Sequence, residues 1–92
     1  MSRPLLTLRY DLRAPSWAKP LPDLYAATIE QCQWAERHGF ATVSFGEHHG
    51  CDDGYCPSPF VAAAAVAGAT TAIQLRVLAL LPLYDPIRCA ED

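Results

Sequence analysis

Residues 73–81 read IQLRVLALL, an almost continuous aliphatic run that only Gln74 and Arg76 interrupt. Runs of this kind are typical of strands in parallel sheets, which are buried on both faces because crossover helices cover them. We therefore predict a strand over residues 73–81 that is buried on both faces. The chain before it should contain the other strands of the sheet and the helices that connect them.

Two stretches closer to the start of the chain also have the composition of strands. Residues 5–10 alternate in polarity toward their end, and residues 41–46 contain Val43 and Phe45, which are strong strand formers. Polarity rises abruptly at Glu47, so the second strand should end there. The sequence thus predicts three strands.

Helices are predicted between these strands. Apolar side chains recur at steps of three and four from Leu21 onward, and Gly39 suits the position just past the end of this amphipathic helix. Ser58 followed by Pro59 indicates the N-cap and first residue of a second helix. That helix is apolar on all sides over residues 60–69, so we expect it to be buried between the sheet and neighbouring helices.

The predicted order is β-α-β-α-β, followed by a further helix that starts at Ile87, where Asp85 and Pro86 repeat the cap-then-proline signal. Crossover helices imply a parallel sheet, either doubly wound or part of a (β/α)8 barrel. Residues 11–15 contain no glycine, which counts against the phosphate loop of a dinucleotide-binding sheet. Three strands cannot close a barrel, so we expect residues 1–92 to be an incomplete part of one α/β domain.

The composition limits the classes of protein to which the chain can belong. Apolar residues make up 51% of the chain and charged residues 18%, which indicates a packed interior rather than disorder. The net charge of -3 provides no basic surface for nucleic acid. The four cysteines are too sparse for a disulfide framework, so we expect a reduced, cytoplasmic protein. Residues 60–69 are too short for a membrane span, which needs about 20 apolar residues.

Polar side chains follow the predicted strand ends, where ligands bind in both candidate architectures. Three places qualify: residues 10–13, the triplet Glu47-His48-His49, and residues 78–85. A histidine can act there as acid, base or hydrogen-bond donor near neutral pH. Alternation along a strand places Glu47 and His49 on one side and His48 on the other, so only one side can face a pocket. The alternative is that these side chains merely cap the strand end.

A metal site is the other chemistry that this region could support, because residues 48–56 contain two histidines, two cysteines and two aspartates. Cys51 and Cys56 are separated by four residues, but a zinc site needs a second ligand pair, and the sequence has none. We therefore predict no metal site. A small metal-binding or interaction module without catalysis is the rival interpretation.

Several motifs, in this order, are similar to one known family. They are residues 35–40 (AERHGF), Glu47-His48-His49, residues 58–64 (SPFVAAA), residues 80–86 (LLPLYDP) and residues 90–92 (AED). Together they resemble the N-terminal third of the bacterial luciferase-like monooxygenases. The resemblance covers nearly the whole chain and rests on the order and spacing of the motifs.

The resemblance implies a (β/α)8 TIM barrel, of which residues 1–92 would be the N-terminal β-α-β-α-β portion. It implies an oxidoreductase whose pocket holds reduced FMN, supplied by a partner flavin reductase, and which uses O2 to oxidise a small organic substrate. In a sister branch a 5-deazaflavin coenzyme transfers hydride instead. Deazaflavin relatives often have aspartate where this chain has Glu47, so the glutamate favours flavin. For the full-length enzyme we expect a homo-oligomer.

The resemblance also implies roles for single residues. His48 matches the family histidine that hydrogen-bonds the flavin or acts as acid or base, so it is the candidate catalytic residue. Glu47, Leu78 and Ala79 are the candidate cofactor-binding residues. A non-prolyl cis peptide that supports the flavin ring is expected near Leu78 and Ala79.

At the end of the first strand, Tyr10 and Asp11 would line the substrate side. The phosphate-binding part of such barrels comes from the last strands and their loops, which lie outside these residues. We therefore expect the isolated chain to be catalytically inactive and the activity to belong to the full-length enzyme.

Overall fold

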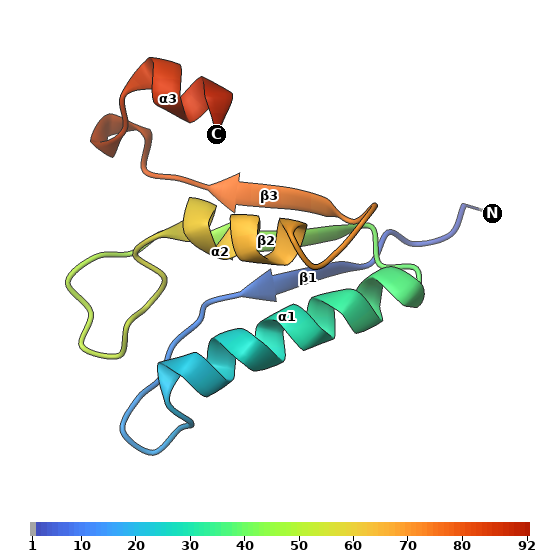
Figure 1. Cartoon of the computed structure of the whole chain (residues 1–92), viewed down its shortest axis with the longest axis horizontal. Coiled ribbons are helices and arrows are strands. Elements are labelled where there is room, and N and C mark those ends of the chain that lie inside the picture. Colours follow the sequence, from blue (N-terminus) through green and yellow to red (C-terminus); the bar gives the residue numbers. More distant parts are fainter. Residues whose placement is uncertain (1) are drawn as a thin grey trace.

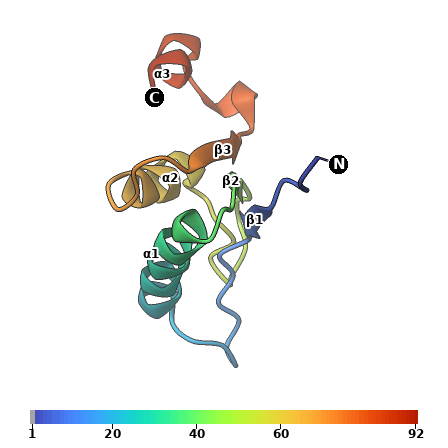
Figure 2. The same cartoon turned by 90° about the vertical axis from the view of Figure 1, so that its right-hand side faces the viewer.

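The computed structural model describes residues 2–92 as a three-stranded parallel sheet with helices packed on one face (Figure 1). In chain order the elements are β1 (Thr7–Tyr10), α1 (Leu21–Arg37), β2 (Thr42–Gly46), α2 (Pro59–Ala67), β3 (Gln74–Leu78), the 3-10 turn η1 (Leu81–Leu83) and α3 (Pro86–Glu91). Figure 2 shows α1 and α2 together on one side of the sheet. The predicted α/β class and the β-α-β-α-β order are therefore confirmed.

The central strand of the sheet is β2, which pairs in parallel with β1 on one side and with β3 on the other. In this register Ser44 lies between Arg9 and Arg76. Because all three strands run the same way, their carboxyl ends meet at one edge of the sheet. The loops that leave this edge are residues 11–20, residues 47–58 and the segment after β3.

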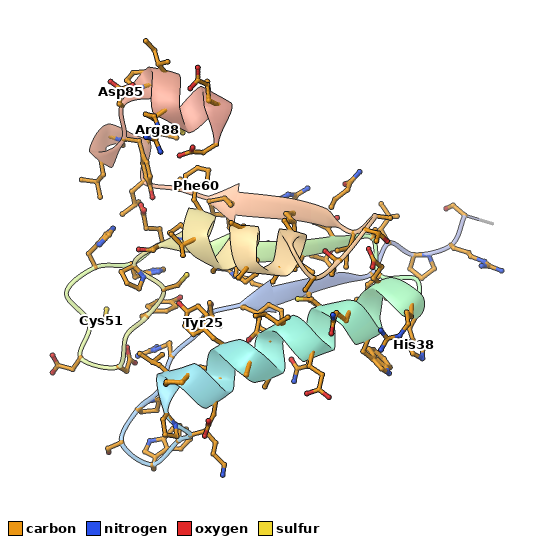
Figure 3. All side chains as sticks on the ribbon, in the orientation of Figure 1. Tyr25, His38, Cys51, Phe60, Asp85 and Arg88 are labelled. Atoms are coloured by element: carbon orange, nitrogen blue, oxygen red, sulfur yellow. The ribbon has the colours of Figure 1, made fainter. Side chains whose placement is uncertain are left out.

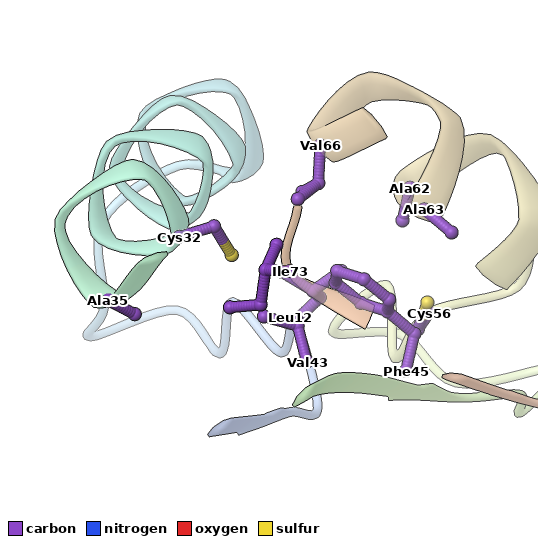
Figure 4. Close-up of a cluster of buried hydrophobic side chains, with 10 residues drawn as sticks. All are labelled: Leu12, Cys32, Ala35, Val43, Phe45, Cys56, Ala62, Ala63, Val66 and Ile73. Carbon is purple, nitrogen blue, oxygen red and sulfur yellow. The ribbon is translucent and has the colours of Figure 1, made fainter. Parts of the chain in front are cut away.

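The hydrophobic core lies between the sheet and the two long helices (Figure 4). Val43 and Phe45 of β2 face the helices and are completely buried. Cys32 and Ala35 come from the predicted apolar stripe of α1, and Val66 comes from α2. The amphipathic character predicted for α1 is thus confirmed.

The last turn of α1 is tied to the start of β3 by one carboxylate. Glu36 accepts hydrogen bonds from the backbone N–H groups of Thr71 at 2.9 Å and Ile73 at 2.8 Å, and from that of Ala72 between them. These hydrogen bonds, that of Ala72 foremost, lower the pKa of the Glu36 carboxyl. Gly39 follows the helix with a φ of 83°, the left-handed conformation that ends many helices.

The third strand differs from its prediction. β3 ends at Leu78, three residues earlier than expected, and its side chains alternate between exposed and half-buried. The expectation of burial on both faces is wrong because, within residues 2–92, β3 is an edge strand and helices cover only one face of the sheet. Leu78 consequently remains 47% exposed.

The second helix is shorter and less buried than expected. α2 ends at Ala67, and Val61 on its outer side is 70% exposed. Ser58 occupies the N-cap position, but its side chain makes no capping hydrogen bond. By contrast, the Asp85 side chain caps α3 as predicted, accepting from the backbone N–H groups of Ile87 and Arg88. The helix after Asp85 begins at Pro86, one residue before the predicted start.

All four cysteines are free thiols, and burial raises the pKa of the Cys32 and Cys56 thiols. In the part of the chain that the structure describes, every helix is too short or too polar to cross a bilayer.

Candidate functional site

The carboxyl edge of the sheet brings together the three places that the sequence singled out. Figure 3 shows the loop that contains Cys51 at this edge, whereas His38 lies at the opposite end of the molecule. His48 and Glu47 directly follow β2, Asp11 directly follows β1, and residues 79–84 follow β3.

Glu47 is buried at this edge, and both of its carboxylate oxygens are engaged by the chain. Oε2 accepts the backbone N–H of Leu80 at 2.7 Å, and Oε1 accepts the hydroxyl of Tyr84. His49 Nε2 lies 3.6 Å from Oε1. The carboxylate therefore joins the end of β2 to the segment that follows β3, and Glu47 and His49 lie on one side, as alternation predicted.

The electrostatics of Glu47 combine two opposing effects. Burial on its own raises the pKa of the Glu47 carboxyl, but the hydrogen bonds from Tyr84 and Leu80 and the nearby His49 outweigh it, so the pKa is lowered. The hydrogen bond to Glu47 raises the pKa of Tyr84 to about 12. Glu47 is thus held as a carboxylate and Tyr84 as a neutral phenol at physiological pH.

His48 lies on the other side of the strand end. Its imidazole is stacked on the ring of Tyr55, with 3.7 Å between ring centroids and an interplanar angle of 17°. A Cβ placed on Gly46 would be 4.0 Å from His48 Cε1, so the imidazole lies over the face of the sheet that the helices leave open. Within residues 2–92 its ring nitrogens make no hydrogen bond, which leaves them available to a ligand.

Tyr55 is held by the loop that follows β1. Its hydroxyl donates to Asp11 Oδ1 at 3.3 Å, and its backbone N–H donates to Asp53 Oδ1 at 3.2 Å. The guanidinium of Arg13 lies 4.9 Å from the centre of the Tyr55 ring, and Arg13 Nε donates to Asp53 Oδ2 at 2.6 Å. We call Asp11, Arg13, Asp53 and Tyr55 the loop clasp.

The loop clasp contains residues that sequence reasoning missed. Arg13 falls within residues 10–13, which the sequence singled out, but without a role of its own. Asp53 was considered only as a candidate metal ligand, and Tyr55 carried no recognised motif. Arg13 and Asp53 are 40 positions apart, so no local pattern could have paired them. The hydrogen bond from Arg13 now lowers the pKa of the Asp53 carboxyl.

Leu12 between Asp11 and Arg13 has an unusual backbone. Its φ is 54°, in the left-handed region that non-glycine residues rarely adopt, and its side chain is 3% exposed. Such strain persists where the surroundings hold it, and it concentrates at functional sites. Here the buried side chain and the contacts of both neighbours with Tyr55 hold it.

The other candidate residues are distributed over both faces. The Tyr10 ring stacks on that of Phe45, with 5.9 Å between ring centroids, and its hydroxyl donates to Gln31 at 2.9 Å. The side chain of Tyr10 therefore faces α1 rather than Asp11. Leu78 lies beside Gly46 in the register of β2 and β3 and is half exposed.

The expectation of a cis peptide near Leu78 and Ala79 is not met, since every peptide bond in residues 2–92 is trans. A non-prolyl cis bond is costly and needs surrounding structure to hold it. β3 is the edge strand of residues 2–92, and no further strand in this part of the chain pairs with its outer edge to do so.

The donor set at this edge suits an organic ring better than a metal ion. No group of three or more histidine, cysteine, aspartate or glutamate side chains within residues 2–92 could hold a metal. Exposed Leu78 offers an apolar contact and exposed His48 offers its ring nitrogens, which together fit one side of a planar heterocycle such as a flavin.

The chain is similar to proteins of one known family. The family model for luciferase-like monooxygenases matches residues 9–92. The oxygenase component of the flavin-dependent trigonelline monooxygenase of Acinetobacter baylyi is 35% identical over 70 residues, which cover 75% of this chain and 19% of that protein. The alkanal monooxygenase alpha chains of Photorhabdus laumondii and Photorhabdus luminescens are each 41% identical over 59 residues, which cover 63% of this chain and 16% of theirs.

A solved structure supports the same relationship at the level of the fold. The crystal structure of apo-MsnO8 superposes with a TM-score of 0.82 at 26% identity, covering 95% of this chain and 26% of that one. The chain therefore spans less than a fifth of the curated relatives it matches, and its whole length corresponds to one portion of a larger α/β structure.

Proposed function

Because the chain belongs to the luciferase-like monooxygenase family, we propose that it forms part of the active site of an enzyme that uses reduced FMN and O2 to oxidise a small organic substrate. The observation that carries the proposal is the position of His48, whose free ring nitrogens lie at the carboxyl edge of the sheet, where such barrels bind their ligands. The chain is short compared with its relatives, so the activity is proposed for a completed barrel.

In this proposal His48 is the catalytic residue. Bound reduced FMN would supply the electrons that activate O2. The imidazole of His48 would hold or deliver a proton at the edge of the bound ring, since a histidine exchanges protons readily near neutral pH.

The remaining candidates form the walls of the site. Leu78 and Ala79 would contact the cofactor ring directly, and Glu47 would act on the cofactor side by holding the segment after β3 in place. Asp11 and Tyr10 would border the substrate side, with Tyr10 contributing through the end of β1 because its ring faces α1.

The proposal includes a separate flavin reductase as partner. One relative is named an oxygenase component, which supports a division of labour between flavin reduction and oxygenation. Free cysteines throughout the chain suit a reducing cytoplasm. A homo-oligomeric full-length enzyme stays part of the proposal.

An exchange of segments tests this function. The matching segment of the Photorhabdus luminescens alkanal monooxygenase alpha chain would be replaced by the corresponding part of residues 9–92, and alkanal oxidation would be measured with reduced FMN. We expect the chimera to retain oxidation and the His48→Ala chimera to lose about 100-fold or more in kcat. His38→Ala, at the opposite end of the sheet, is the matched control.

The result that would contradict the proposal is equally specific. Full activity of the His48→Ala chimera, or no oxidation by a chimera that circular dichroism shows to be folded, would count against it. If the chimera with the large exchange does not fold, a chimera in which only residues 47–58 are exchanged tests the role of His48 with fewer new contacts.

A further inference from the structure

We propose that Tyr55 is a positioning residue, which fixes the orientation of the His48 imidazole and is itself held by Asp11, Arg13 and Asp53. This inference rests on the proposed role of His48. It assigns a task to a side chain that neither the sequence motifs nor the similarity to known proteins singles out.

The first step is the contact between the two rings. The centroids of His48 and Tyr55 are 3.7 Å apart and their planes differ by 17°, so the rings lie face to face over most of their area. Stacking of this kind restricts tilting of the imidazole away from the plane of the Tyr55 ring. It leaves the edge of the imidazole, where both nitrogens lie, unobstructed.

The second step is that no hydrogen bond in the described part of the chain competes with Tyr55 for this task. Within residues 2–92 no hydrogen bond fixes the ring nitrogens of His48, and Gly46 beneath the ring has no side chain that could press against it. The backbone N–H of His48 donates to Cys56 O at 3.1 Å, which locates the main chain but not the ring. The side-chain torsions of His48 therefore depend on Tyr55.

The third step is that Tyr55 is fixed at three points. Asp11 accepts from its hydroxyl, Asp53 accepts from its backbone N–H, and the Arg13 guanidinium lies near its ring. Arg13 and Asp53 are in turn joined at 2.6 Å, and Ala14 N–H donates to Asp53 O at 2.8 Å. The loop after β1 thus determines, through Tyr55, how a side chain after β2 is oriented.

Orientation of this kind matters for catalysis. A reacting group that is held in its productive geometry before the ligand arrives loses little entropy in the reaction, and small misplacements slow the reaction strongly. Loosening Tyr55 should therefore lower the rate of the chemical step more than it weakens binding.

Nuclear magnetic resonance on the 92-residue chain tests the geometry. We expect cross-relaxation between the rings of His48 and Tyr55, and upfield displacement of the His48 ring protons because they lie over an aromatic face. Tyr55→Leu should remove the displacement, and Tyr55→Phe should restore it because the ring is kept. Asp53→Asn should reduce it because the loop clasp is weakened.

A matched control is available at the other end of the molecule. Trp34 stacks on His38 with centroids 4.0 Å apart and an interplanar angle of 16°. Trp34→Leu should shift the signals of His38 and leave those of His48 unchanged. Absent cross-relaxation, random-coil signals for His48 in the unsubstituted chain, or a displacement that survives Tyr55→Leu would overturn the proposal.

Kinetics in the chimera separate this inference from the function on which it rests. Tyr55→Leu should lower kcat by about tenfold with KM changed less than about twofold, and Tyr55→Phe should recover most of the loss. If His48→Ala abolishes oxidation but Tyr55→Leu has no effect on kcat, Tyr55 has no positioning role and the proposed function stands. If His48→Ala has no effect, the proposed function itself fails.

Discussion

The hydroxyl of Tyr84 donates a hydrogen bond to the carboxylate of Glu47, which lies 37 positions earlier in the chain. This bond, with that from Leu80 N–H to the same carboxylate, connects the end of the central strand β2 to the segment after the edge strand β3. In the described residues the edge strand pairs with a strand on one side only, so side-chain contacts of this kind hold its carboxyl end in place.

The first prediction concerns the ionisation of Tyr84. Its pKa is raised to about 12 because the neutral phenol donates to Glu47 and burial disfavours the phenolate. In Glu47→Gln the partner is no longer charged, so the pKa should fall toward the ordinary value of about 10. Ultraviolet titration of the phenolate measures this pKa. Subtracting the titration curve of Tyr84→Phe shows which part of the absorbance change comes from Tyr84. An unchanged midpoint in Glu47→Gln would contradict the assigned contact.

The second prediction concerns Glu36 and pH. Its carboxylate receives backbone hydrogen bonds from residues 71–73, which lower its pKa in the folded chain. A group whose folded pKa is lowered stabilises the fold above its unfolded pKa, about 4.3 for glutamate, and loses that contribution as pH falls through the folded pKa. Glu36→Gln should therefore lower stability at neutral pH and flatten its decline in acid.

Denaturant unfolding of the Glu36 variant at several pH values, with amide exchange at Ala72 and Ile73, checks this prediction. Glu30→Gln is the control, because Glu30 is exposed on the same helix and, within residues 2–92, makes no hydrogen bond to residues 71–73. Equal pH dependence of the two variants would show that the Glu36 contacts do not form in solution.

The third prediction compares two helix starts. Asp85 accepts from the N–H groups of Ile87 and Arg88 at 3.0 and 3.1 Å, whereas the Ser58 side chain makes no capping hydrogen bond. Asp85→Ala should destabilise α3 by about 1 kcal/mol, the usual effect of losing a cap, and Ser58→Ala should be nearly neutral. Amide exchange at Ile87 and thermal unfolding distinguish the two, and a larger effect of Ser58→Ala would refute the assignment.

The fourth prediction compares two glycines with left-handed backbones. Gly50 and Gly54 have φ values of 70° and 71°. Alanine at either position should lower the free energy of unfolding by about 1 kcal/mol, because its Cβ strains a left-handed backbone. A Cβ at Gly54 would also lie 2.6 Å from Leu21 Cδ1, whereas one at Gly50 would meet nothing within 4 Å. Gly54→Ala should therefore lower the unfolding midpoint in denaturant more than Gly50→Ala, and the reverse order would contradict the packing of Leu21.

Much of the secondary structure could be predicted from local patterns. The apolar stripe from Leu21, the proline starts at Pro59 and Pro86, and Gly39 after α1 are signals that depend on neighbours within one or two turns. The predictions were wrong where the local sequence pattern does not reflect the tertiary environment of the residues. The aliphatic run over residues 73–81 predicted burial on both faces, yet β3 is an edge strand here and Leu78 remains half exposed.

The candidate site could be predicted only in part. Parallel strands bring Asp11, His48 and Leu78 to one edge, and this follows from the order of elements. The direction of each side chain does not follow: Tyr10 was expected to line the substrate side with Asp11, whereas its side chain faces α1. Arg13 and Asp53 come from two loops with irregular backbone. Such loops have no periodic sequence pattern, so their contact could not be predicted.

The sequence by itself determined the α/β order, the parallel direction of the strands and the family to which the chain belongs, because periodicity, caps and motif order are local properties. Tertiary structure alone decided that Glu47 is joined to Tyr84 and that His48 lies against Tyr55. Those contacts join residues from separate loops and strand ends, and their geometry depends on backbone turns such as that at Leu12, whose neighbours are held by contacts with distant Tyr55.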